Sequence, residues 1–177
     1  MCYNLAMIKT FIIVAQTTDG FIAKNSGHEA TWTSKEDKKR FVEITKRAGV
    51  MVMGLNTFNT FPSPLPGRLH IVYSPDENAS DKNIPGVVEY TKDISVDLIK
   101  KLEERGFTEV AICGGTTIYT MFMKSGLVET IYLTIEPKFF GKGMGIFNED
   151  LDINLKLIES SVTEGGTVLA EYKIANK

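Results

Sequence analysis

Short apolar runs that recur along the chain constrain its fold more than any other feature of the sequence. Residues 8–15, 50–53 and 109–113 are almost continuously apolar, and their length favours strands over helices. Segments with helical spacing of apolar residues separate these runs. A strand that is apolar at nearly every position is buried on both faces, as in a parallel sheet covered by helices. The sequence therefore predicts an α/β fold with helices on both faces of a largely parallel sheet.

The remaining elements are assigned from caps, turns and spacing. Helices are predicted over 34–47, 56–61, 96–106 and 116–124, and further strands over 69–73, 87–90 and 129–136. Residues 155–162 and 168–174 are predicted to form a terminal antiparallel hairpin. The polar segment 24–31 is expected to be a mobile loop. We expect one domain over 8–177 after a tail over 1–7, with Met7 as a second possible start beside Met1.

Charge and cysteine content narrow the classes of function. The net charge of −2 gives no electrostatic support for binding nucleic acid. No apolar run approaches the roughly 20 residues of a membrane helix, so no membrane partner is expected. Two cysteines, Cys2 and Cys113, suit a reducing cytosol, and we expect a cytoplasmic protein. No cysteine and histidine cluster has the spacing of a metal site, so no metal is expected.

A glycine pair follows the predicted strand over 109–113, at the edge of the sheet where α/β proteins bind ligands. Gly114 and Gly115 precede a helix whose free N–H groups and positive end suit a phosphate, with Thr116 and Thr117 as further donors. A tight turn capped by one of these threonines is an equally good interpretation. The segment lacks the G-x-G-x-x-G pattern, so it does not indicate a standard Rossmann site.

A second glycine ends the strand over 50–53. Gly54 is followed by Leu55, Asn56 and Thr57, which suit another phosphate or, equally, a simple helix cap by Asn56. The strand ends expected to lie around one cleft are Ala15, Gly54, Tyr73, Ser74, Gly114 and Gly115.

Asp37 is the candidate acid. It lies three residues after Ser34, so one interpretation is a capping-box acid at a helix start. Phe41 lies one turn further on the same helix face. A carboxyl beside an aromatic ring in a partly dry cleft has a raised pKa. Such a carboxyl can bind an amidine-like edge through two hydrogen bonds and assist protonation of a ring nitrogen.

Three further residues are ambiguous when taken singly. Arg68 ends a turn-forming run, Pro64 to Arg68, and is either a solvated cation or a group that binds an anionic part of a substrate. Tyr119 and Thr134 lie in a predicted helix and strand and are each compatible with core or cap positions.

Taken in order, these segments resemble the dihydrofolate reductase superfamily over about residues 11–147. The matching segments are Trp32 with Asp37 and Phe41, Val52 to Gly54 with Thr57, Pro64 to Arg68, Ile112 to Gly115 with Tyr119, and Tyr132 to Thr134. The resemblance implies a dihydrofolate reductase-like three-layer sandwich with a mostly parallel central sheet and a C-terminal antiparallel hairpin. It also implies a cis peptide bond between Gly114 and Gly115.

The resemblance implies roles at the substrate end. Asp37, helped by Thr134, would bind the amino-pyrimidine edge of a pterin and promote protonation of the reacting imine. Phe41 would pack on the substrate, and Arg68 would hold its glutamate carboxylate. The other residues that the resemblance places near the substrate are Lys38, Phe61 and Cys113.

The resemblance also implies that the chain binds NADPH. The backbone at Ala15 and Ile22 would bind the nicotinamide amide, Tyr119 would lie near the nicotinamide, and the loop from Ala23 to Thr31 would close over it. Residues implied to hold the rest of the cofactor are Gly54, Leu55, Asn56, Thr57, Tyr73, Ser74, Gly114, Gly115, Thr116, Thr117 and Ile118.

The chain departs from typical members in three places. Leu55 and Asn56 stand where basic residues contact the 2′-phosphate of NADPH, so NADH stays open as the cofactor. Lys38 stands where an apolar residue is usual. Residues 126–129 and 136–143 are more similar to the pyrimidine reductase of riboflavin biosynthesis.

Three functions follow as hypotheses. The first is reduction of dihydrofolate to tetrahydrofolate, the second reduction of a ribosylaminopyrimidine phosphate, and the third a non-catalytic nucleotide-binding module. Each implies a small-molecule partner, and both a monomer and a homodimer are compatible with the fold.

Overall fold

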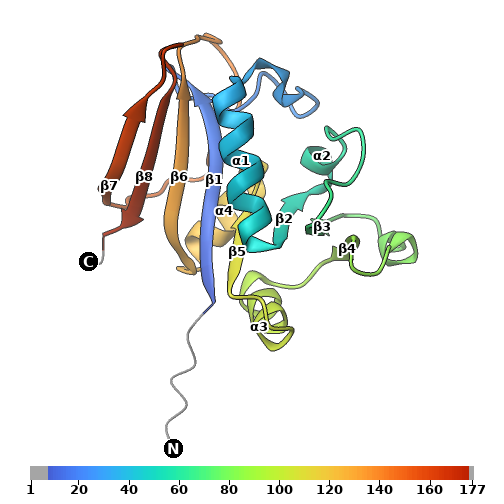
Figure 1. Cartoon of the computed structure of the whole chain (residues 1–177). Helices are drawn as coiled ribbons and strands as arrows, with labels where there is room; N and C mark the ends of the chain where they lie inside the picture. The colour runs from blue at the N-terminus through green and yellow to red at the C-terminus, as the bar shows by residue number, and fades with distance from the viewer. Residues whose placement is uncertain (1–7, 176–177) are drawn as a thin grey trace, which may run out of the picture.

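An eight-stranded sheet runs through the middle of the molecule in the computed structural model, which describes residues 8–175 (Figure 1). The expected tail over 1–7, with Cys2 and the choice between Met1 and Met7, lies outside the described residues. The strands are β1 (Lys9–Thr17), β2 (Val50–Gly54), β3 (Leu69–Tyr73), β4 (Val88–Thr91), β5 (Glu109–Ile112), β6 (Val128–Glu136), β7 (Leu155–Val162) and β8 (Val168–Ile174). The helices are α1 (Lys35–Ala48), α2 (Leu55–Phe58), α3 (Ser95–Glu104) and α4 (Thr116–Lys124), with short 3-10 turns at Ala30–Trp32 and Ala79–Lys82.

The strand order is β4-β3-β2-β5-β1-β6-β8-β7. The first six strands run parallel, whereas β8 pairs antiparallel with β6, and β7 with β8. The predicted parallel sheet with a closing hairpin is confirmed. Because parallel strands share one direction, β1, β2, β3 and β5 present their carboxyl ends at the same edge of the sheet.

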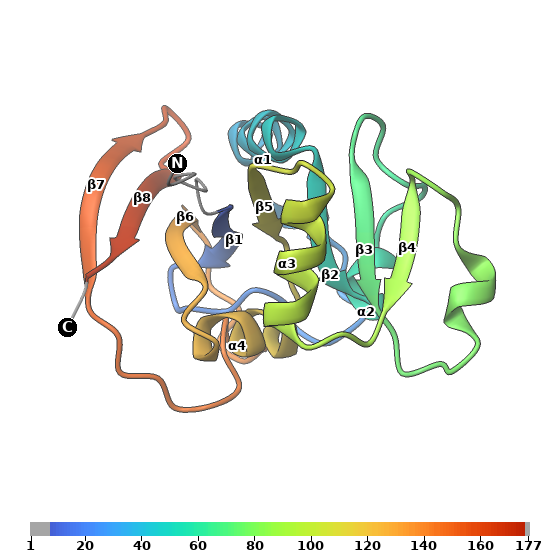
Figure 2. The same ribbon diagram turned by 90° about the horizontal axis from the view of Figure 1, so that it is seen from below.

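Helices cover both faces of this sheet, as the sequence predicts (Figure 2). On one face, Ile44 and Ala48 of α1 share a buried apolar cluster with residues of β1, β2 and β5. On the other face, Leu102 of α3 and Phe122 of α4 are fully buried in a second cluster. Full burial of one such side chain contributes about 1.5–3 kcal/mol, so the two apolar layers hold the strand ends in place. Within residues 8–175, no helix has the length and apolar character needed to cross a bilayer.

Local sequence signals set the ends of α1. The Asp37 N–H donates to Ser34 Oγ at 3.1 Å, so Ser34 is the N-cap that the sequence predicts. The helix ends at Gly49, whose φ of 72° is left-handed and favours glycine. These two caps fix where Asp37 lies, in the first turn of the helix.

The helix predicted over 56–61 is wrong in its extent. α2 stops at Phe58, because the N–H groups of Thr60 and Phe61 bond to carbonyls three residues back and tighten the chain before Pro62. Gly54 occupies the N-cap position without a side-chain bond, so the interpretation of Asn56 as a simple cap is also wrong.

Candidate active site

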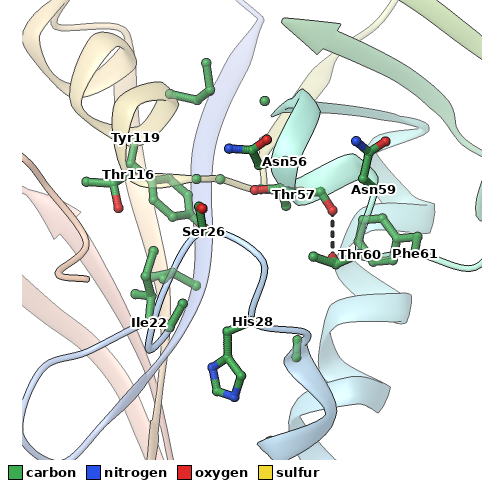
Figure 3. A pocket seen from close by; sticks show the side chains of 18 of the residues that line it. Ile22, Ser26, His28, Asn56, Thr57, Asn59, Thr60, Phe61, Thr116 and Tyr119 are labelled. Carbon is green, nitrogen blue, oxygen red and sulfur yellow. Dashed lines mark hydrogen bonds between the residues drawn. The ribbon is translucent and has the colours of Figure 1, made fainter. Parts of the chain in front are cut away.

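A large cavity opens at the carboxyl ends of β1, β2, β3 and β5. Its volume is about 1180 Å³, above the roughly 300–1,000 Å³ of most ligand sites, so it has room for a dinucleotide and a second ring system. Residues from α2, α4 and the loop after β1 line it (Figure 3). The predicted site residues that line it are Ala15, Ile22, Asp37, Lys38, Phe41, Gly54, Leu55, Asn56, Thr57, Phe61, Tyr73, Ser74, Cys113, Gly114, Gly115, Thr116, Thr117, Ile118 and Tyr119. The strand ends expected around one cleft are therefore brought together.

The middle of the cavity wall is main chain, and we call Gly54, Gly114 and Gly115 the glycine wall. The Gly54 N–H donates to the Gly114 carbonyl at 2.8 Å, which joins the ends of β2 and β5. The bond between Gly114 and Gly115 is cis, as expected. A Cβ atom on Gly115 would lie 3.3 Å from Thr57 Oγ1, and one on Gly54 would lie 3.4 Å from Ile118 Cγ1. A side chain at either position would press on Thr57 or Ile118, so glycine lets these strand ends lie close to their neighbours with the main chain forming the wall.

Helix α4 begins at the glycine wall. Gly115 is its N-cap and makes no side-chain bond, so the interpretation of a turn capped by Thr116 or Thr117 is wrong. Thr116 is buried and its hydroxyl donates to the Gly145 carbonyl at 2.9 Å. Thr117 is exposed and lines the cavity. Its hydroxyl and the positive end of this nine-residue helix can therefore meet an anionic group.

Asp37 lies at one end of the cavity and is partly buried. Burial raises the pKa of its carboxyl, and hydrogen bonds from the Thr134 and Thr33 hydroxyls lower it. The charge of Glu136 raises this pKa further, Arg40 lowers it, and the balance lies above the ordinary value. A carboxyl of this kind can bind a ligand and deliver a proton.

The capping-box interpretation of Asp37 is not supported. In a capping box the acid at this position would accept the Ser34 N–H. That N–H instead donates to Glu136 Oε1 at 2.7 Å. The cap therefore leaves the Asp37 carboxyl free to face the cavity.

Tyr119 and Cys113 line the cavity from its buried side. Tyr119 is 3% exposed, and its hydroxyl donates to the Ile13 carbonyl at 2.8 Å. Burial raises the pKa of both the phenol and the Cys113 thiol, so both groups stay neutral. A buried, protonated thiol is a poor nucleophile, and Cys113 contributes shape to the cavity.

The ends of β3 and β4 form the opposite end of the cavity. The Tyr73 hydroxyl is buried without a hydrogen-bond partner among the described residues, and burial raises its pKa. Because an unpaired buried hydroxyl is costly, a polar ligand atom next to it would be favoured. Lys92, which directly follows β4, is exposed and supplies a cation here that Leu55 and Asn56 do not.

Thr134 and Arg68 do not line the cavity. Thr134 is 2% exposed, and its hydroxyl lowers the pKa of the Asp37 carboxyl. Arg68 is 6% exposed, and its guanidinium donates to Thr45 Oγ1 at 2.8 Å and to the Pro66 carbonyl at 3.2 Å. This arrangement does not support the expected contact between Arg68 and a substrate carboxylate, because the guanidinium is buried and forms hydrogen bonds within the protein.

The sequence interpretation missed several residues of the site. Thr33 and Glu136 act on Asp37 directly. Glu136 follows Thr134 by two positions on a strand, so alternation would have placed both on the same face. Ser26 and His28 line the cavity from the loop over 23–31 that was expected at the nicotinamide, although neither residue was singled out (Figure 3). Asn59 and Thr60 also line it and were missed, because they lie in the irregular segment after α2.

Comparison with known proteins identifies the family. The family model described as dihydrofolate reductase matches residues 9–155. The chain belongs to the dihydrofolate reductase family. Dihydrofolate reductase type 9 of Escherichia coli is 29% identical over 124 residues, which cover 70% of this chain and 67% of that protein.

Solved structures share the fold of this dihydrofolate reductase family member. A dihydrofolate reductase from Enterococcus faecalis complexed with NADP(H) has a TM-score of 0.73 and 20% identity, over 95% of this chain and 97% of that one. A deaminase and 5-amino-6-(5-phosphoribosylamino)uracil reductase from Thermotoga maritima has a TM-score of 0.80 and 16% identity, over 96% of this chain and 57% of that one. The dihydrofolate reductase-like fold that the sequence predicts is therefore confirmed.

Proposed function

We propose that the chain is an NADPH-dependent reductase that converts dihydrofolate to tetrahydrofolate. The observation that carries this proposal is the Asp37 carboxyl, which is partly buried, has a raised pKa and faces a cavity large enough for two ligands. In a site where a reduced nicotinamide gives a hydride to an imine, such an acid is the proton donor that the reaction requires.

The glycine wall fits a dinucleotide, because Gly54, Gly114 and Gly115 line the cavity without side chains that would keep a phosphate from the main chain. We assign the cofactor phosphates to the glycine wall, Thr57 and Thr117. Ala15, Ile22 and Tyr119 would bind the nicotinamide end, and Tyr73 and Lys92 the adenosine end. Lys92 favours NADPH over NADH, since a cation attracts a 2′-phosphate.

When bound, the nicotinamide supplies a hydride to the carbon of the substrate imine. The carboxyl group of Asp37 binds the amino-pyrimidine edge by hydrogen bonds, which orients the pterin ring. The raised pKa of Asp37 keeps a proton available at that edge, and the imine nitrogen gains one proton as its carbon gains the hydride. The Thr134 and Thr33 hydroxyls favour the ionised form of the carboxyl and so limit the rise in its pKa. Phe41 and Phe61, whose ring centroids are 6.4 Å apart, form an apolar surface for the substrate.

The direct test is a spectrophotometric assay of the purified protein with NADPH and dihydrofolate. We expect reduced-nicotinamide absorbance to fall only when both are present, and a lower KM for NADPH than for NADH. If neither cofactor is oxidised at protein concentrations that bind NADPH, the proposal is contradicted. The chain would then be a non-catalytic nucleotide-binding module.

One observation favours a second candidate, reduction of a ribosylaminopyrimidine phosphate. Arg68 is withdrawn from the cavity, whereas Lys38 is exposed at it, next to Asp37. A lysine is a suitable partner for a phosphate group on a small substrate. Turnover of the pyrimidine phosphate with none of dihydrofolate would establish this candidate over the first.

A further inference from the structure

Glu136 is a buried carboxylate that the proposed reduction does not use. It is 4% exposed at the end of β6, two residues after Thr134. Because alternate residues of a strand face the same side, Thr134 and Glu136 both face the segment that leads into α1. Burying a carboxylate is costly unless hydrogen bonds satisfy it, so its partners indicate what it holds.

The two carboxylate oxygens bind two different segments. Oε1 of Glu136 accepts the Ser34 N–H at 2.7 Å, and Oε2 accepts the Thr167 hydroxyl at 2.8 Å. Ser34 Oγ in turn accepts the Asp37 N–H at 3.1 Å. A continuous chain of hydrogen bonds therefore runs from the turn before β8, through Glu136, to the backbone of Asp37.

The same carboxylate also acts on Asp37 through its charge. The groups that face Asp37 are Arg40 from α1, Thr33 from the segment before it, Thr134 and Glu136 from β6, and Tyr119 from α4. Tyr119 is neutral because burial raises its pKa. Arg40 opposes Glu136, but its guanidinium also donates to the Leu133 and Ala170 carbonyls, at 3.1 and 2.8 Å. Glu136 is thus the facing group that disfavours ionisation of Asp37.

We propose that Glu136 is a positioning residue for Asp37: it holds the start of α1 and places a second negative charge beside the candidate acid. The catalytic consequence rests on the proposed function. The coupling between the two carboxyl groups belongs to the free protein and can be measured without any substrate.

The decisive variant is Glu136→Gln, because glutamine keeps an oxygen for the Ser34 N–H while the charge is removed. A carbon-13 NMR titration of the side-chain carboxyls, without ligands, reports the midpoint of Asp37. We expect this midpoint to fall by about half to one pH unit in the variant. An unchanged or raised midpoint in a folded variant overturns the proposal.

Glu171→Gln is the matched control, because it removes an equal charge from the neighbouring strand β8. Glu171 acts on Arg40 and is not among the groups that face Asp37. We expect the control to move the Asp37 midpoint by much less than Glu136→Gln does. Equal shifts in the two variants would mean that general charge, and not the placement of Glu136, sets the midpoint, which overturns the proposal.

Turnover separates this role from a merely structural one. At pH values above the Asp37 midpoints of wild type and variant, Glu136→Gln should reduce turnover about 3–10-fold. This factor is the expected midpoint shift expressed as a change in the protonated fraction of Asp37. At pH values below both Asp37 midpoints, turnover should not change. A loss that is equal at every pH would indicate a structural role and overturn the proposal. A wild-type protein that reduces no substrate contradicts the proposed function, whereas the NMR titration still decides the role of Glu136.

The wild-type protein carries the test if Glu136→Gln does not fold. The Ser34 N–H donates to Glu136 Oε1 at 2.7 Å, so the Ser34 amide should exchange with solvent more slowly than the amide of Lys35, which begins the helix and, like other first-turn N–H groups, has no intrahelical partner. A Ser34 amide that exchanges as fast as that of Lys35 overturns the proposal.

Discussion

In the middle of the cavity, main-chain atoms of Gly54, Gly114 and Gly115 form the wall, whereas at the Asp37 end the wall is made of side chains. The glycine wall comes from two strand ends joined by one backbone hydrogen bond. The environment of Asp37 is assembled from the start of α1, from β6, and from the turn before β8. Ser34 and Glu136 are 102 residues apart in sequence, and Thr167 follows Glu136 by 31 residues. A main-chain wall offers shape and hydrogen bonds that do not depend on pH, whereas a carboxyl among side chains offers a proton whose availability its neighbours control. Variants of the glycine wall should therefore weaken cofactor binding, whereas variants around Asp37 should change turnover and its pH dependence.

Asp37→Asn should produce the largest effect. Removal of a general acid typically costs about 100-fold or more in turnover, so we expect at least that loss. The dissociation constant for NADPH, measured by fluorescence titration, should not change, because Asp37 is not part of the glycine wall. Normal turnover of both candidate substrates would show that the acid is misassigned, and a loss of NADPH binding would show that the two regions are not separate.

The same variant should remove the contribution of Asp37 to the pH dependence of stability. The folded-state pKa of Asp37 is raised above its ordinary value of 3.8, so its contribution to stability is complete below that pH. The contribution is lost as pH rises through the raised folded-state pKa, because the folded state then must release a proton that it holds more tightly than the unfolded state does. Asp37→Asn should therefore have a higher Tm than wild type at neutral pH and an equal Tm at acid pH. An equal Tm difference at both would contradict the raised pKa.

Arg68→Gln distinguishes the substrate-binding role that the family resemblance implies from the structural role that the geometry indicates. The structure predicts a loss of about 1–3 kcal/mol in the free energy of unfolding, because the buried bonds to Thr45 and Pro66 are broken. The KM for dihydrofolate should change little, since the guanidinium does not reach the cavity. The resemblance predicts the opposite, a large rise in KM with little change in stability. Urea denaturation and initial-rate kinetics on the same preparation decide between them.

Gly115→Ala tests the glycine wall. The added Cβ would lie 3.3 Å from Thr57 Oγ1, and we expect overpacking of about 1 kcal/mol or more to weaken NADPH binding roughly fivefold to tenfold. The pH dependence of turnover should keep its midpoint. Gly165→Ala is a suitable control, because its nearest atom, Thr163 Oγ1, is 3.8 Å away in the hairpin. A shifted pH midpoint in Gly115→Ala would mean that the wall and the acid are coupled.

Sequence reasoning located the glycine wall more completely than it located the acid's environment, and the reason is physical. The glycines follow buried strands directly, and parallel strands end at one edge, so local sequence and topology suffice. Asp37 could be proposed from its spacing to Phe41, but its partner Glu136 is brought to it only by the pairing of β6 with β1 and the packing of α1. The direction in which Arg68 turns depends on Thr45, a helix residue 23 positions away, and no local pattern carries that information.

Lys38→Met should give the smallest effect. It tests whether Lys38 binds an anionic part of the substrate. Lys38 is exposed at the cavity and takes part in no ion pair found among residues 8–175. An exposed charge contributes about 0.2–1 kcal/mol, so we expect KM for an anionic substrate to rise no more than about fivefold, and less at high salt. Lys39→Met is the matched control, since Lys39 lies on the same helix, pairs with Glu43 at 3.9 Å and does not line the cavity. The KM for 7,8-dihydrobiopterin, which carries no carboxylate, should not change in Lys38→Met. An equal rise in KM for this pterin and for dihydrofolate would mean that Lys38 acts on the ring through shape and not on the anionic tail through charge.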